Sequence, residues 1–234
     1  MLAIIKKELG TYFRSPIGYV FCAVYLFFSA LYFEVILGYG VSSYFGELYS
    51  GMLNIVLLLL PVLTMRMFSE ERHRKTDQVL LTSPVSITGI VMGKFLAAFI
   101  VYAACVVFTL SYAVVFCIFS PAPWALIFGN VIGALFYGAA FIAMGMFISS
   151  MTESQVVAAI ITFTLGSLFI LIDVIPNLTN NKYIISFINW ISFTGRYTPF
   201  TLGLLDFSSL IFFLSVCAVF IFLTVRVIER RRWS

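Results

Sequence analysis

The chain alternates between six long apolar runs and short polar segments that carry most of its charge. The runs cover about 17–37, 51–68, 124–148, 155–173 and 208–227, and the third run extends from an entry at Gly93-Lys94 to about 119. Each is long enough to cross a hydrocarbon core of roughly 30 Å as a helix, which takes about 20 residues. No alternating strand pattern is present, and lipid excludes open sheet edges. The pattern predicts an all-α polytopic membrane protein with six transmembrane helices, the second kinked or thinned at Pro61.

Composition supports this interpretation. Hydrophobic residues make up 62% of the 234 positions and charged residues only 10%, against about a quarter charged in soluble domains. The net charge of +4 would suit nucleic acid, but the basic residues sit in short clusters between apolar runs, as in membrane topogenesis. We therefore expect membrane lipid and no nucleic acid as a partner. No polar stretch could hold a core of its own, so 1–234 is predicted to be a single transmembrane domain.

Orientation follows from the lysines and arginines that flank the runs. One side has twelve of the 14 and the other has Lys182 and Arg196. The larger set comprises Lys6, Lys7, Arg14, Arg66, Arg72, Arg74, Lys75, Lys94, Arg226, Arg230, Arg231 and Arg232. The positive-inside rule places the larger set in the cytoplasm. Because the number of runs is even, both termini are expected there.

The first fourteen residues precede the apolar runs and show helical periodicity. Leu2, Ile5, Leu9 and either Tyr12 or Phe13 fall on one stripe, with Lys6, Lys7 and Arg14 off it. This pattern predicts an amphipathic helix lying in the membrane interface and ending at Ser15–Pro16.

Catalytic and metal-binding patterns are weak. The four cysteines lie inside apolar runs without CxxC spacing or histidine neighbours, which disfavours a metal site or a disulfide framework. The single histidine, His73, falls in a basic loop and has no nucleophile partner. Asp173 and Asp206 are expected at the outer interface rather than as an intramembrane dyad. We expect no metal, no bound cofactor and no enzymatic activity in this chain.

The sequence also shows neither of two features that would let the chain drive transport by itself. The spans are predicted to have no ionisable residue in their interior, which disfavours a proton-coupled pump. Gly93-Lys94 is interpreted as the start of the third span, because the GxxxxGK[ST] phosphate loop is not present. Any ATP-driven work would therefore need a second polypeptide.

The polar segment between the second and third spans, 69–86, is the most informative part of the chain. Ser69 is a plausible N-cap, and Glu70 and Glu71 would occupy the first turn. Thr82-Ser83-Pro84 should end the helix. A compact cytoplasmic helix is one interpretation, and a solvated loop that only enforces topology is the other.

This segment resembles the permease subunits of ABC-2 type transporters, particularly the gliding-motility-associated group. The matching positions are Glu71-Arg72, Thr76-Asp77, Val79-Leu80-Leu81-Thr82 and Pro84-Val85, with Lys75 replacing the usual glycine and Asp77 the usual glutamate. The resemblance extends over nearly the whole chain, through Gly93-Lys94, Tyr197-Thr-Pro-Phe, Gly203-Leu-Leu-Asp and the final Glu229-Arg-Arg-Arg-Trp.

The resemblance implies how such a chain would work. The cytoplasmic helix would be a coupling helix that docks on a separate soluble ABC ATPase through Glu71, Arg72, Thr76, Asp77, Leu80, Leu81 and Pro84. The amphipathic start would be an elbow helix that uses Ile5, Lys6, Lys7, Leu9 and Arg14. Two ATPase copies, which bind ATP and Mg²⁺, would serve two permease chains, expected to be identical, in a bacterial cytoplasmic membrane. The chain would couple ATP hydrolysis to export or mechanical work.

Two further sequence features lead to predictions, one about helix packing and one about the outer side of the membrane. Gly129 and Gly133 form a small-xxx-small pair, which favours close packing within the chain over a dimer seam. On the outer side, Tyr183, Phe187, Trp190 and Phe193 have near-helical spacing before a break at Pro199. They predict one or two short outer interfacial helices, which form either an aromatic belt or an outer gate.

Two alternative functions remain open from the sequence. The chain could be a membrane-embedded enzyme that acts on lipid or peptide, or a scaffold subunit without a translocation path. A transporter subunit should co-purify with a soluble ATPase, and an enzyme should not need one.

Overall fold

The computed structural model describes residues 2–39, 45–75, 86–118, 123–173, 188 and 190–232. Every regular element among them is a helix, and six stretches are long and apolar enough to cross a membrane. The six stretches are Pro16–Gly38, Phe45–His73, Ile87–Phe116, Trp124–Met151, Gln155–Ile172 and Phe207–Arg231. The predicted all-α polytopic membrane fold with six transmembrane helices is therefore confirmed.

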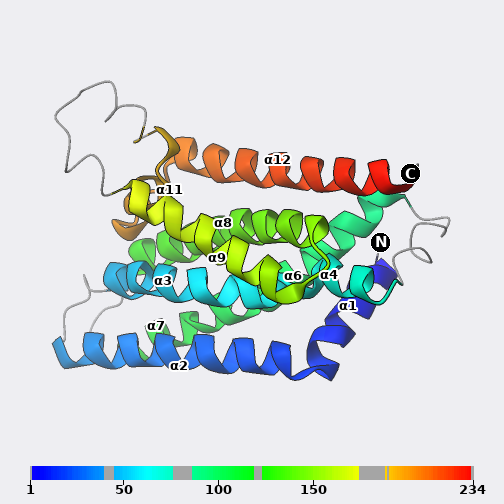
Figure 1. The fold of residues 1–234 in the computed structure, drawn as a ribbon. Helices are drawn as coiled ribbons and strands as arrows, with labels where there is room; N and C mark the ends of the chain where they lie inside the picture. Colours follow the sequence, from blue (N-terminus) through cyan, green and yellow to red (C-terminus); the bar gives the residue numbers. More distant parts are fainter. Residues whose placement is uncertain are drawn as a thin grey trace.

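The amphipathic start forms α1 (Leu2–Arg14), which is followed at once by α2 (Pro16–Tyr39). Proline suits the first position of α2, because its missing N–H would have no partner within the helix. Figure 1 shows α1 turned away from the axis of α2, at the end of the bundle where both chain termini lie. We call this the terminal end.

The second and third spans each consist of two helices. α3 (Phe45–Thr64) passes through Pro61 and is followed by α4 (Arg66–His73). α3 begins six residues before the predicted start at Gly51, because Phe45, Leu48 and Tyr49 are buried. The third span is divided into α6 (Ile87–Phe108) and α7 (Leu110–Phe116). The division of the third span was not predicted, since the apolar pattern continues across it. For the second span the sequence predicted a kink at Pro61 and a new helix from Ser69, and the structure begins the new helix at Arg66.

The fourth span, α8 (Trp124–Met151), is the centre of the bundle. It packs against α3, α4, α6, α7 and α9 (Gln155–Ile172), and also against α11 (Phe193–Thr201) and α12 (Phe207–Arg232). Figure 1 shows α8 surrounded by these helices. α2, α9 and α12 are more peripheral, with less than a third of their most apolar window buried. Their exposed apolar faces are those expected of helices surrounded by lipid.

Glycines allow α11 to approach α8 closely. A Cβ on Gly129 would lie 3.0 Å from Gly203 Cα, and a Cβ on Gly133 would lie 2.7 Å from the Phe200 ring. The contact is within one chain, so the prediction of intrachain packing for this glycine pair is confirmed. The predicted break at Pro199 is wrong, because α11 continues through it to Thr201.

Candidate functional site

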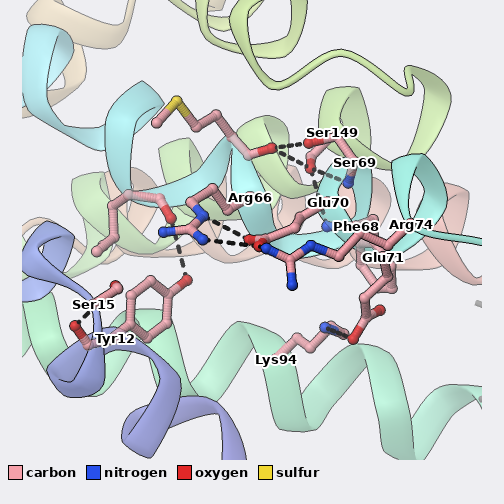
Figure 2. A network of polar contacts seen from close by, with 12 residues as sticks. Tyr12, Ser15, Arg66, Phe68, Ser69, Glu70, Glu71, Arg74, Lys94 and Ser149 are labelled. Carbon is pink, nitrogen blue, oxygen red and sulfur yellow. Dashed lines mark hydrogen bonds and ion pairs between the residues drawn. The ribbon is translucent and has the colours of Figure 1, made fainter. Parts of the chain in front are cut away.

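Lys94 is the centre of an ion cluster at the terminal end. Its side chain is 2% exposed. The Nζ group donates hydrogen bonds to Glu71 Oε1 at 2.8 Å and to Glu8 Oε1 at 3.1 Å, and it lies 5.2 Å from the centre of the Phe68 ring (Figure 2). A buried ammonium is stable only when it is paired and hydrogen-bonded. Lys94 therefore ties together α6, α4 and α1.

Two further contacts hold α1 in this position. The Tyr12 hydroxyl donates to the carbonyl of Leu63, at the end of α3, over 3.1 Å. Burial, with a smaller contribution from the Glu8 carboxylate, raises the pKa of Tyr12 well above its usual value, so the phenol keeps the proton that it donates. Lys7 lies 3.7 Å from Glu8 and 3.8 Å from Glu71 at the exposed rim. The first helix is thus bonded to the second and third spans.

A second ion group runs along α4. Arg66 holds Glu70 through two hydrogen bonds, Nε to Oε2 at 2.6 Å and Nη2 to Oε1 at 2.9 Å. Arg74 reaches the same carboxylate from the other side, with Nη2 2.9 Å from Oε1 (Figure 2). Bidentate arginine–carboxylate pairs are among the stronger charge-assisted hydrogen bonds. They add rigidity to the short helix that precedes the segment 76–85.

Ser149 of α8 caps the beginning of α4. Its Oγ accepts hydrogen bonds from the backbone N–H groups of Phe68 at 3.1 Å and Ser69 at 3.2 Å, and donates to the Met65 carbonyl at 2.9 Å. The N–H groups of a helix up to its third residue have no partner within it, so this hydroxyl from another helix satisfies that of Phe68, the third residue of α4. The prediction that Ser69 is the N-cap is wrong, because Ser69 lies within α4 and its Oγ donates to the Met65 carbonyl.

Arg72 joins the end of α4 to the link between α8 and α9. Its Nη1 donates to the Met151 carbonyl at 2.8 Å, and its Nη2 lies 2.9 Å from Glu153 Oε1. Glu153 is 63% exposed, so this ion pair contributes little stability by itself. Together with the hydrogen bond to the Met151 carbonyl, it holds the end of α4 beside α8 and the α8–α9 link.

These contacts together make a frame of described residues on both sides of the segment 76–85. α4 ends at His73 just before the segment, and α6 begins at Ile87 just after it. Lys94 bonds the two helices to each other and to α1. Among the described residues, no three His, Cys, Asp or Glu side chains gather as a metal site requires.

The predicted interface residues fall partly within this frame. Glu71 and Arg72 belong to it, while Thr76, Asp77, Leu80, Leu81 and Pro84 lie outside the described residues. Of the predicted elbow residues, Ile5 and Leu9 are half-buried against the core, and Lys6, Lys7 and Arg14 are exposed. The structure thus forms the amphipathic helix with the predicted stripe facing the bundle, apart from Leu2, which is 83% exposed.

The candidate outer residues separate into two environments. Tyr183 and Phe187 lie outside the described residues. Trp190 is 67% exposed, whereas Phe193 is buried among rings of α8, α9 and α12. Only Trp190 of the described pair faces outward, as a belt or gate residue would.

Sequence reasoning missed the central residue of the cluster. Lys94 was expected to mark the start of the third span, but it is the eighth residue of α6 and is buried. Its burial was not expected, because Lys94 was counted among the basic residues that flank the spans. The available signal was a lysine that follows seven apolar or small residues, together with the acidic residue Glu8 in the amphipathic start.

Comparison with known proteins identifies the family of the chain. The sequence model described as ABC-2 family transporter protein matches residues 2–233, nearly the whole chain. A comparison with curated proteins finds no match. The match spans all six membrane helices and the ion cluster at the terminal end. The chain therefore belongs to the ABC-2 transporter family and is a multi-pass membrane permease component.

Proposed function

We propose that this chain is the membrane-spanning subunit that couples ATP hydrolysis by a separate ABC ATPase to export or mechanical work. Family membership over residues 2–233 supports the permease role. The sequence contains no phosphate loop, so ATP and Mg²⁺ would bind to the partner. The chain itself would be non-catalytic.

The ion cluster around Lys94 carries the proposal. An ATPase that pushes on the segment 76–85 would displace α4 and α6, the two helices that flank it. Lys94 bonds both helices to α1 through Glu71 and Glu8, and Arg72 bonds α4 to the end of α8 and to the α8–α9 link. The displacement would therefore pass to α1, to α8 and to that link. A loop that served only topology would not need buried ion pairs at its base, since exposed charge alone sets orientation.

The proposal also states which side of the membrane the terminal end faces and how the subunits assemble. The terminal end would face the cytoplasm of a bacterial cell, because it carries the larger set of basic residues. Two identical copies of this chain would pair about a twofold axis and present two segments to two ATPase subunits, as closed symmetry favours. A pathway between copies would need no charged lining within either copy.

Co-purification tests the proposal directly. An affinity-tagged chain purified from its native cells in mild detergent should bring down a soluble ATPase in equal amount, and native mass spectrometry should give two of each. Leu80→Asp should reduce ATPase recovery while the chain remains monodisperse, because an unpaired charge in a protein interface costs several kcal/mol. The matched control is Leu204→Asp, which makes the same change at an exposed residue just after α11, outside the membrane spans.

Two results would contradict the proposal. Equal ATPase recovery with wild type and Leu80→Asp would indicate that the segment 76–85 only enforces topology. ATP or lipid turnover by the isolated chain would replace the permease assignment with that of a membrane enzyme.

A further inference from the structure

A groove lies at the terminal end between the beginning of α6 and the end of α12, which lie side by side there (Figure 1). Its volume is about 570 Å³, within the range of about 300–1,000 Å³ typical of small-molecule sites. Thr88 and Met92 of α6 form one wall, and Ala218, Ile221 and Val225 of α12 form the other. The walls are therefore almost wholly apolar.

Charge gathers at the mouth of this groove. Arg226 is 64% exposed, and its Nη1 lies 3.1 Å from Glu229 Oε2. The guanidinium also lies over the Phe222 ring, 5.0 Å from its centre. Between 226 and 232 the chain has four arginines and one glutamate, a net charge of +3. Of these, Arg226 and Glu229 line the groove, and the other three arginines follow them in the sequence beyond it. The apolar groove therefore adjoins a basic helix end, which we call the basic rim.

The position of the groove indicates which ligand fits it. α12 belongs to a membrane span that ends at Arg231, so the basic rim lies where lipid headgroups meet the hydrocarbon core. A soluble anion would gain nothing from the apolar walls, and a zwitterionic lipid would gain little from a net positive rim. An anionic lipid satisfies both parts, because basic pockets between membrane helices bind anionic headgroups.

We propose that this groove binds one anionic glycerophospholipid, with an acyl chain between α6 and α12 and the phosphate at Arg226. The proposal is independent of the coupling function. Arg226 is available to the phosphate because its pairing with Glu229 is exposed and therefore weak. Glu229 acts against binding, since its carboxylate competes with the phosphate for the same guanidinium.

Native mass spectrometry of the purified full chain tests the site, with phosphatidylglycerol and phosphatidylcholine of identical acyl chains as probes. Wild type should retain one phosphatidylglycerol in preference to phosphatidylcholine. Arg226→Gln should weaken phosphatidylglycerol retention about fivefold, the effect of one basic residue near an anionic surface. Glu229→Gln should strengthen it.

A second pair of variants tests the slot without changing charge. Ala218→Phe fills the groove and should remove retention of the bound phosphatidylglycerol. Val219→Phe adds the same ring at the next position, which is exposed but does not line the groove, and should leave retention unchanged. Equal retention of the two lipids by wild type would overturn the proposal. Unchanged phosphatidylglycerol retention in both Arg226→Gln and Ala218→Phe would overturn it as well.

Discussion

Lys94 and Glu8 are 86 residues apart in the sequence, and Lys94 Nζ donates a 3.1 Å hydrogen bond to Glu8 Oε1. This contact joins an amphipathic helix, α1, to the interior of a membrane span. The same buried ammonium also bonds Glu71, so it acts beside the Tyr12 hydroxyl and Lys7 in holding α1. Any change in the charge of this cluster should therefore affect both the stability of the terminal end and the placement of α1.

Replacing Lys94 with methionine should destabilise the chain by about 3 kcal/mol, the lower end of the range for breaking a buried pair. The loss arises because Glu8 and Glu71 would lose their buried, hydrogen-bonded partner and keep between them the more distant and exposed Lys7 ammonium. Thermal unfolding in detergent measures the effect, and Lys6→Met serves as the control because Lys6 is exposed. The triple change Lys94→Met, Glu8→Gln, Glu71→Gln should recover most of the loss. A Lys94→Met chain as stable as Lys6→Met would contradict the role of the cluster.

Removing the Ser149 hydroxyl should cost about 1–2 kcal/mol, the usual effect of losing a helix cap. Ser149→Ala would leave the Phe68 and Ser69 N–H groups without the acceptor that Ser149 Oγ provides. Ser150→Ala is a matched control, since its neighbouring and equally buried hydroxyl bonds only the Phe147 carbonyl of its own helix. Proteolysis near Arg74 should also accelerate in Ser149→Ala. Equal stability of the two variants would show that the cap contributes nothing.

The sequence predicts the membrane helices well, because their hydropathy determines them. It predicts poorly the contacts between side chains of different helices. The six spans follow from length and apolar content, because lipid requires backbone hydrogen bonds to close within each helix. Lys94 was misplaced because its partners, Glu8 and Glu71, come from distant segments that no periodicity links. Ser69 was mistaken for a cap because Ser149, the residue that caps α4, lies about 80 positions away.

Replacing Gly133 with alanine should destabilise the chain by about 1–3 kcal/mol, as overpacking usually does. The new Cβ would lie 2.7 Å from the Phe200 ring, so α11 would have to move away from α8. Gly10→Ala is the control, because a Cβ there meets nothing within 4 Å, and its effect should be neutral or slightly stabilising. Combining Gly133→Ala with Phe200→Leu should cost less than the sum of the two changes. Strict additivity would contradict direct contact between these residues.

The last prediction is that the terminal end faces the cytoplasm. Among the described residues, Arg196 is the one lysine or arginine at the opposite end of the bundle, and every other one lies at the terminal end. A cysteine at Lys75 should therefore resist a membrane-impermeant maleimide in intact cells and react after lysis, whereas one at Asn180 should react in both. The native cysteines Cys22, Cys105, Cys117 and Cys217 are first replaced by alanine, and that parent chain is the control. Reversed labelling would place the segment 76–85 outside the cell, where no ATPase that uses cytoplasmic ATP could reach it, and the coupling proposal would fail with the orientation.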